Sequence, residues 1–152
     1  MRHTWFVSFC TVVATGGCLG ATAPDCIDTT GPGGIGGIYG YAAADAGGAV
    51  LVNGNLIVTA GSPPDFTGTW NTYWSPSADT TAPIGPQIGQ GTFTANIQDG
   101  RVVIAMNPPN VDNNVELNGC YTNDGIRGAW HFTTIAGERA SGTFTLHQLR
   151  VY

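Results

Sequence analysis

The stretch Gly91–Met106, with the sequence GTFTANIQDGRVVIAM, decides the fold. Its first half alternates apolar and polar residues, so every second side chain faces the same side of a strand. Asp-Gly at positions 99 and 100 is typical of a two-residue turn with positive φ, after which the chain returns. This turn pairs apolar residues with one another: Ile97 with Val102, Ala95 with Ile104 and Phe93 with Met106. The stretch therefore predicts an antiparallel hairpin with one buried face.

Two further strands with this alternation follow at Val115–Tyr121 and Ile126–Thr134, joined through Asn-Asp-Gly at positions 123–125. If residues 124 and 125 form the turn, small and apolar residues face each other: Gly119 faces Trp130 and Leu117 faces Phe132. A five-residue loop, 135–139, then leads into a last strand, which pairs Trp130 with Phe144 and Phe132 with Gly142. Three consecutive strands therefore share one apolar face.

A short motif recurs along the chain, in which a glycine lies two residues before an aromatic residue on the same face of a strand. It occurs four times: Gly68-Thr69-Trp70, Gly91-Thr92-Phe93, Gly128-Ala129-Trp130 and Gly142-Thr143-Phe144. At such a glycine a strand bends easily, and a neighbouring ring can lie over the missing side chain. Repeated bending favours a sheet that closes on itself.

A weaker group of strands precedes these hairpins, at residues 37–43, 49–52 and 55–60, with Asn53-Gly54 as another hairpin turn. Beyond the first residues of the chain, no segment shows the sustained apolar spacing of an amphipathic helix. The expected fold class is all-β, an antiparallel up-and-down meander barrel of about eight or nine short strands.

Two segments carry a resemblance to known families. Phe66-Thr67-Gly68-Thr69-Trp70 resembles the opening strand of lipocalins and of avidin-like barrels, and Ser141–Leu146 is similar to the last strand of small bacterial lipoprotein barrels. The resemblance covers Phe66–Arg150 and implies a calycin-type barrel. Avidin-type sites need polar side chains inside the barrel, whereas the inward faces here are apolar, so biotin binding is not expected.

Large aromatic side chains gather on the predicted inward face. They are Trp70, Trp74, Phe93, Trp130, Phe132 and Phe144. An eight-stranded barrel is just wide enough to be filled by side chains or to hold one small ligand. These rings therefore either fill the core or line a cavity for a small apolar ligand.

The N-terminus has the form of an export signal. A cationic start, Met1-Arg2-His3, precedes an apolar run of about ten residues, which is too short to span a membrane. Thr15-Gly16-Gly17-Cys18 resembles a bacterial lipobox, with Thr15 where that motif usually has Leu. The resemblance implies a lipoprotein signal peptide at 1–17, lipidation at Cys18 and, because Leu19 follows, the outer membrane.

An ordinary signal-peptidase site competes with this interpretation. Ala21-Thr22-Ala23 has the required small-x-small form, although Pro24 directly after the cut is disfavoured. Cleavage there would give a secreted or periplasmic protein.

The cysteines also indicate export. Cys10 leaves with the signal and Cys18 is lipidated or removed, so Cys26 and Cys120 remain as a pair. Two thiols in an exported protein most simply form one disulfide. Neither belongs to a C-x-x-C motif, so a redox or zinc site is not expected.

Residues 18–36 form a Gly/Pro/Thr-rich tether before a barrel domain at 37–152. The tether contains G-x-G-x-x-G at Gly31, Gly33 and Gly36, but lacks the preceding strand and following helix of a dinucleotide-binding unit. A second irregular stretch, Ser75–Gln90, contains three prolines. Loops of this length are usually functional or disordered, and this one could cover a barrel mouth or dock a partner.

Charge and motif content exclude several functions. The net charge is −5 and no basic stripe exists, so nucleic acid is not an expected partner. No G-x-S-x-G or H-E-x-x-H occurs, and Glu116 and Glu138 have no evident acid/base partner. His131 and His147 fall on the outward face, too far apart to share a metal. No enzyme activity, cofactor or metal is expected.

The sequence therefore favours a lipid-anchored β-barrel of the cell envelope, attached to a membrane through its N-terminus. It would act as a non-catalytic protein-interaction or structural module. The alternatives are a lipocalin-like binder of a small apolar ligand in the barrel interior, and a secreted enzyme without a recognisable motif.

Overall fold

The computed structural model describes residues 26, 36–62, 64–98, 100–110, 112–123 and 125–151. This part of the chain forms eight strands: β1 (Gly37–Asp45), β2 (Val50–Ser62), β3 (Asp65–Trp74), β4 (Gly89–Gln98), β5 (Arg101–Ala105), β6 (Asn113–Thr122), β7 (Gly125–Thr134) and β8 (Gly137–Val151). Cys18, the predicted signal peptide and all of the predicted tether except Cys26 and Gly36 lie outside the described residues.

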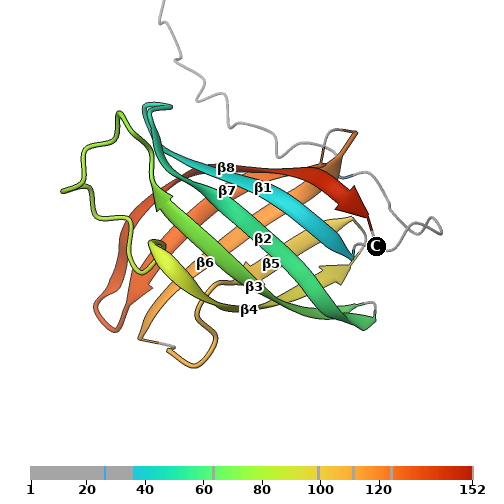
Figure 1. Cartoon of the computed structure of the whole chain (residues 1–152). Coiled ribbons are helices and arrows are strands. Elements are labelled where there is room, and N and C mark those ends of the chain that lie inside the picture. The colour runs from blue at the N-terminus through green and yellow to red at the C-terminus, as the bar shows by residue number, and fades with distance from the viewer. Residues whose placement is uncertain are drawn as a thin grey trace, which may run out of the picture.

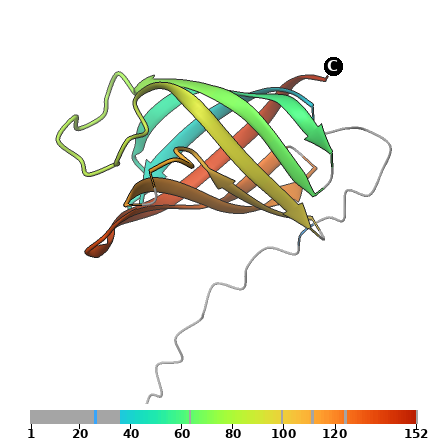
Figure 2. The same ribbon diagram turned by 90° about the horizontal axis from the view of Figure 1, so that it is seen from below.

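Each strand pairs antiparallel with the next, and β8 returns to β1, so the sheet is a closed barrel (Figures 1 and 2). The predicted all-β, antiparallel meander barrel is confirmed. Among the described residues, no helix is long and apolar enough to span a membrane.

The hairpin that decides the fold has the predicted register. On β4 and β5, Ala95 pairs with Ile104 and Ile97 with Val102, as the Asp-Gly dipeptide predicts. The predicted partner of Phe93, Met106, lies just beyond the end of β5 and is completely buried. Alternation and a single turn dipeptide were sufficient to fix this register.

The predicted registers of the last two hairpins are wrong by two residues. Trp130 pairs with Leu117 on β6 and with Gly142 on β8, whereas Phe132 pairs with Val115 and Ala140. The cause is the position of the first turn, which lies one residue earlier than predicted, and the length of the second. Only two residues separate Thr122 from Gly125, and the predicted five-residue loop 135–139 is a two-residue turn before Gly137. Because the slip is an even number of residues, the same side chains still face inward.

The predicted hairpin turn at Asn53-Gly54 is also wrong. β2 runs through it without interruption, and Gly54 pairs with Tyr41 on β1 and Thr72 on β3. A Cβ on Gly54 would lie 2.6 Å from the Thr72 Cα, so the glycine allows close approach of β3 rather than a turn. The actual turn follows Asp45, whose Oδ1 accepts hydrogen bonds from the backbone N–H of Gly47 (2.8 Å) and of Ala49 (2.9 Å).

Rings lie over three of the four motif glycines, as predicted. A Cβ on Gly91 would lie 2.7 Å from the Trp70 ring, and one on Gly142 would lie 2.6 Å from Trp130 Nε1. Gly68 lies in the same way beneath Phe93. Gly128 differs, because the nearest atoms are backbone atoms of β6. These glycines let adjacent strands close tightly around large rings.

Both buried indoles on this inward face also find hydrogen-bond acceptors. Trp70 Nε1 donates to the Met106 carbonyl (2.7 Å) and Trp130 Nε1 to the Ala44 carbonyl (2.8 Å). A buried indole N–H requires such a partner, so the two rings add specificity as well as apolar area. Each bond links strands that are far apart in the sequence.

Candidate functional site

The barrel interior is almost completely filled by side chains. The residual cavity has a volume of about 20 Å³ and is lined by apolar side chains such as Leu56, Phe93 and Ile104. A cavity of about 10–15 Å³ is the minimum for one water molecule, so this space is far too small for an organic ligand.

The structure brings the six predicted cavity-lining aromatics into one core. Trp70, Phe93, Trp130 and Phe144 are buried, and Trp74 and Phe132 are half-buried against them. Phe93 borders the residual cavity. Trp130 also borders an open surface groove of about 460 Å³ beside the loop that follows β3. The rings therefore pack mainly against one another.

One end of the barrel is closed by the second half of the loop between β3 and β4, seen in yellow-green in Figure 1. Gln87 in this loop is completely buried: its Oε1 accepts a hydrogen bond from Tyr41 Oη (2.6 Å) and its Nε2 donates to the Ile84 carbonyl (2.7 Å). Thr72 Oγ1 donates to the Gln87 carbonyl. The loop thus takes the first of its two predicted roles and covers a barrel mouth.

The substitution Gln87→Ala is expected to lower the free energy of unfolding by about 2 kcal/mol, because it leaves the buried Tyr41 hydroxyl without a partner. Cleavage of the loop by a broad-specificity protease should accelerate in parallel. Gln90→Ala, at an exposed position on β4, is the matched control and should be neutral. Equal stability of the two variants in urea denaturation would contradict this role of Gln87.

Tyr41 also makes stability depend on alkaline pH. Burial raises the pKa of Tyr41 well above its ordinary value of 10.0. Above pH 10 the unfolded chain loses this proton while the folded chain keeps it. Deprotonation therefore stabilises the unfolded state relative to the folded state. The stability that Tyr41 contributes should fall by about 1 kcal/mol between pH 10 and 11, and by about 1.4 kcal/mol per pH unit above that. Urea denaturation of wild type and Tyr41→Phe across this pH range measures the contribution. Identical slopes of unfolding free energy against pH for the two proteins would contradict the prediction.

The opposite end of the barrel is hollowed into a bowl of about 540 Å³, which we call the tyrosine bowl. Its lining includes Tyr39, Tyr121, Thr122, Asn123, His147 and Gln148. The two tyrosines also border the residual cavity, so they separate the bowl from the apolar core. The two ends of the barrel therefore differ: one is filled by a loop and the other is open.

The Tyr121 hydroxyl is the unusual group in the bowl. Among the described residues it is shielded from solvent and makes no hydrogen bond of ordinary geometry, but it interacts with the neighbouring Tyr39 hydroxyl. Burial raises the pKa of Tyr39 and of Tyr121, and the neighbouring Tyr39 raises that of Tyr121 further. Both groups therefore remain protonated near neutral pH and can donate hydrogen bonds.

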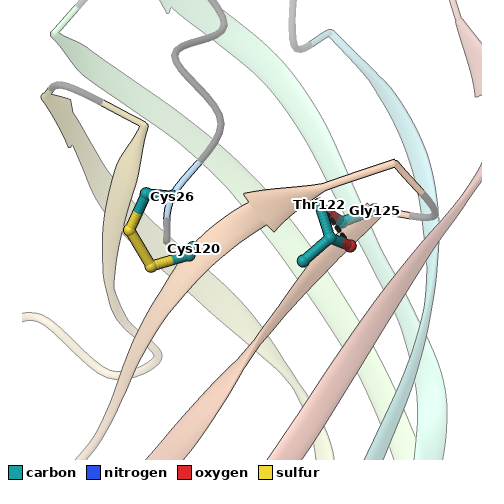
Figure 3. The surroundings of a disulfide bond; sticks show 4 residues. All are labelled: Cys26, Cys120, Thr122 and Gly125. Atoms are coloured by element: carbon teal, nitrogen blue, oxygen red, sulfur yellow. Dashed lines mark hydrogen bonds between the residues drawn. A yellow bond between two sulfur atoms is a disulfide. The ribbon is translucent and has the colours of Figure 1, made fainter. Parts of the chain in front are cut away.

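A disulfide fastens the rim of the bowl, and it is the predicted Cys26–Cys120 pair, with a Cα–Cα distance of 4.8 Å (Figure 3). Cys120 directly precedes Tyr121, whose backbone N–H donates to the Gly100 carbonyl (3.0 Å). Thr122 Oγ1 donates to the Gly125 carbonyl (3.2 Å) across the next turn (Figure 3). The strand end that carries Tyr121 is thus held from several sides.

A cluster of titratable groups lies on the outer surface, on β6, β7 and β8. His131 Nδ1 lies 3.0 Å from Glu138 Oε2, so the expectation that Glu138 has no partner is wrong. Glu116 faces His131 in the register and accepts a hydrogen bond from Asn118 Nδ2 (2.8 Å). Hydrogen bonds from Ser141 and His131 lower the pKa of Glu138. Among the described residues no group of three or more His, Cys, Asp or Glu is arranged to hold a metal ion.

Sequence reasoning missed the tyrosine bowl and Gln87. Tyr39 and Tyr121 occupy β1 and β6, which are not neighbours in the sheet, so no local pattern connects them. Gln87 lies in a proline-rich loop, where a polar residue is normally solvent-exposed. The alternation on β1 and β6 did, however, place both tyrosines on inward-facing positions.

No protein-family model, curated protein or solved structure matches this chain.

Proposed function

We propose that this protein is a lipid-anchored β-barrel of the bacterial cell envelope that acts as a non-catalytic protein-interaction or structural module. The observation that carries the proposal is the disulfide between Cys26 and the barrel strand β6. Disulfides persist in oxidising compartments, which agrees with the export signal read from the N-terminus.

The disulfide also gives the proposed anchor a defined reach. With Cys18 lipidated and Cys26 bonded to the barrel, the free tether is reduced to residues 19–25. At about 5–6 Å times the square root of the residue number, such a segment spans roughly 15 Å on average. The barrel would be held close to the membrane by the end that carries the tyrosine bowl.

The packed interior supports an interaction or structural role over transport of a small apolar ligand. A carrier needs internal volume, and the residual cavity of about 20 Å³ supplies none. Hydrophobic dyes should therefore produce no saturable quenching of tryptophan fluorescence. Saturable quenching that is lost when Phe93 is changed would favour the carrier function instead.

The anchor is tested by expression with the native leader, followed by detergent phase partitioning and intact-mass analysis. We expect an acylated N-terminal Cys18 and a membrane-bound chain. Cys18→Ser should abolish both the acylation and the membrane association. The Cys26–Cys120 disulfide should remain intact in this variant, as evidence that the barrel still folds. An unacylated mature chain that starts at Pro24 would refute the anchor.

A further inference from the structure

We propose that the outer wall of the barrel around Cys120 docks on the anionic headgroups of a phospholipid membrane. This surface, which we call the arginine wall, consists of Arg101 and Val103 on β5, Cys120 on β6 and Arg127 on β7. The inference rests on the anchored barrel proposed above and names the surface that this barrel turns towards its membrane.

The register of the sheet places an arginine on each side of the disulfide. Arg101 pairs with Cys120 across β5 and β6, and Arg127 pairs with Cys120 across β6 and β7. Neighbouring strands lie about 4.8 Å apart, so the two arginine backbones are about 10 Å apart. Val102 and Ile126 point into the core, so the residues beside them point outward, and both arginines are exposed. Two guanidinium groups therefore flank the point at which the N-terminal chain is fastened.

The attachment of the N-terminal chain turns this wall towards the membrane. Cys26 is bonded to Cys120 on the outside of β6 (Figure 3). With Cys18 lipidated, residues 19–25 alone would separate the bilayer from the disulfide, a span of roughly 15 Å. A tether that leaves the wall itself holds this side of the barrel nearest the bilayer. The long arginine stems can then bring their charges to the headgroups.

The charge of the arginine wall is complementary to an anionic membrane. Along the described parts of β5, β6 and β7, the acidic residue nearest to the arginines is Glu116, which lies farther along β6. Asp65, at the same end of the barrel on β3, is hydrogen-bonded to Asn96 (3.0 Å). Asp99 and Asp124, in the adjoining turns, lie outside the described residues, and their formal charges offset part of the attraction. The arginines themselves project from the face that carries the tether.

The opposite end of the barrel has the opposite charge. The turns and loops at that end carry several acidic residues and one exposed arginine, Arg139, on β8. The acidic residues are Asp45, Asp79, Asp112 and Glu138. A membrane with a negative surface potential therefore repels the closed end and attracts the arginine wall. This polarity favours the same orientation as the tether.

Exposed apolar side chains accompany the arginines. Val103 is 40% exposed and faces the same way as Arg101, two residues before it on β5. Leu149, near the end of β8, is 60% exposed and lies at the same end of the barrel. Surfaces that combine basic and apolar side chains are typical of proteins that bind at the membrane interface. The arginine wall has this combination.

The test is sedimentation of the full Cys18→Ser chain, with its disulfide intact, together with lipid vesicles. One set contains phosphatidylcholine alone, and the other contains equal amounts of phosphatidylcholine and phosphatidylglycerol. One arginine near an anionic surface strengthens binding about five-fold and two strengthen it about 30-fold, so the preference for anionic vesicles at low salt should lie within these limits. At 1 M salt, where the screening length is about 3 Å, the preference should disappear. Equal binding to both sets, or no binding to either, would overturn the proposal.

The double variant Arg101→Gln/Arg127→Gln should lose most of the preference for anionic vesicles. Arg139→Gln is the matched control, because it makes the same chemical change at an exposed arginine of the closed end. The control should bind as strongly as the parent chain, and urea denaturation of both variants checks that they are folded. Equal losses in the two variants would show that net charge alone governs binding, which would overturn the assignment to this wall.

Amide NMR with a gadolinium-chelating lipid in the anionic vesicles tests the orientation without any change to the wall. Signals of Val103, Asn118 and Arg127 should broaden, whereas those of Gly47 and Thr81 at the closed end should not. Broadening centred on the closed end would overturn the proposal. Failure of the anchor is distinguishable, because detergent phase partitioning with an uncharged detergent reports the acyl group and these vesicle experiments use an unacylated chain.

Discussion

Replacement of both Cys26 and Cys120 by serine is expected to lower the free energy of unfolding by about 4 kcal/mol. The disulfide closes a loop with a sequence separation of 94 residues. A cross-link across so long a loop removes many conformations from the unfolded chain. In the chain-entropy model a loop of about 100 residues gives about 4.7 kcal/mol, and native-state effects reduce this value.

Urea denaturation of wild type with and without reductant, beside Cys26→Ser/Cys120→Ser, measures this contribution. Reduced wild type should match the double variant, and the double variant should not respond to reductant. The variant must keep the far-ultraviolet signal of the barrel, because the strands close without the bond. A loss below about 1 kcal/mol would mean that the unfolded chain is already compact in this region.

Gly68→Ala is expected to destabilise the barrel by about 3 kcal/mol or more. A Cβ at this position on β3 would overlap both the Ile57 carbonyl oxygen on β2 and the Phe93 ring on β4. The carbonyl belongs to the backbone and cannot rotate away, and Phe93 is almost completely buried. The strands must separate to admit even one methyl group.

The matched control is Gly40→Ala, also a glycine within a strand, here β1. Its Cβ would lie 3.6 Å from Leu149 Cδ1, an ordinary van der Waals distance. This variant should be neutral or gain a few tenths of a kcal/mol, because alanine restricts the unfolded chain. Thermal or urea denaturation of the pair separates steric overlap from the general effect of removing a glycine. Equal stabilities would show that β2 and β3 can move apart easily.

The fold was predictable because the barrel has a simple alternation. Polar residues face outward and apolar residues inward along each hairpin, and one Asp-Gly turn set the register of β4 and β5 correctly. The registers of β6, β7 and β8 were not predictable to the residue. Asn-Asp-Gly at 123–125 offers two overlapping dipeptides as the turn, and both place the same side chains inside.

Tertiary context decided the features that sequence patterns left open. Asn53-Gly54 has the composition of a hairpin turn, but the close approach of Thr72 on β3 requires a glycine within β2. The six aromatic residues predicted to face inward do lie in one core. Whether they enclose a cavity depends on how completely the side chains fill the barrel, which the sequence pattern does not reveal. The disulfide, in contrast, followed from counting the cysteines that the predicted export signal leaves in the mature chain.

Closure of β8 onto β1 has a consequence for how this protein can meet another protein. An open sheet offers a row of unpaired N–H and C=O groups to which a foreign strand can add. The hydrogen-bonded circuit from β1 to β8 leaves no such row on the barrel wall. Recognition must therefore use outward-facing side chains and the loops at the two ends. A partner that adds its own strand would first have to break a seam between existing strands.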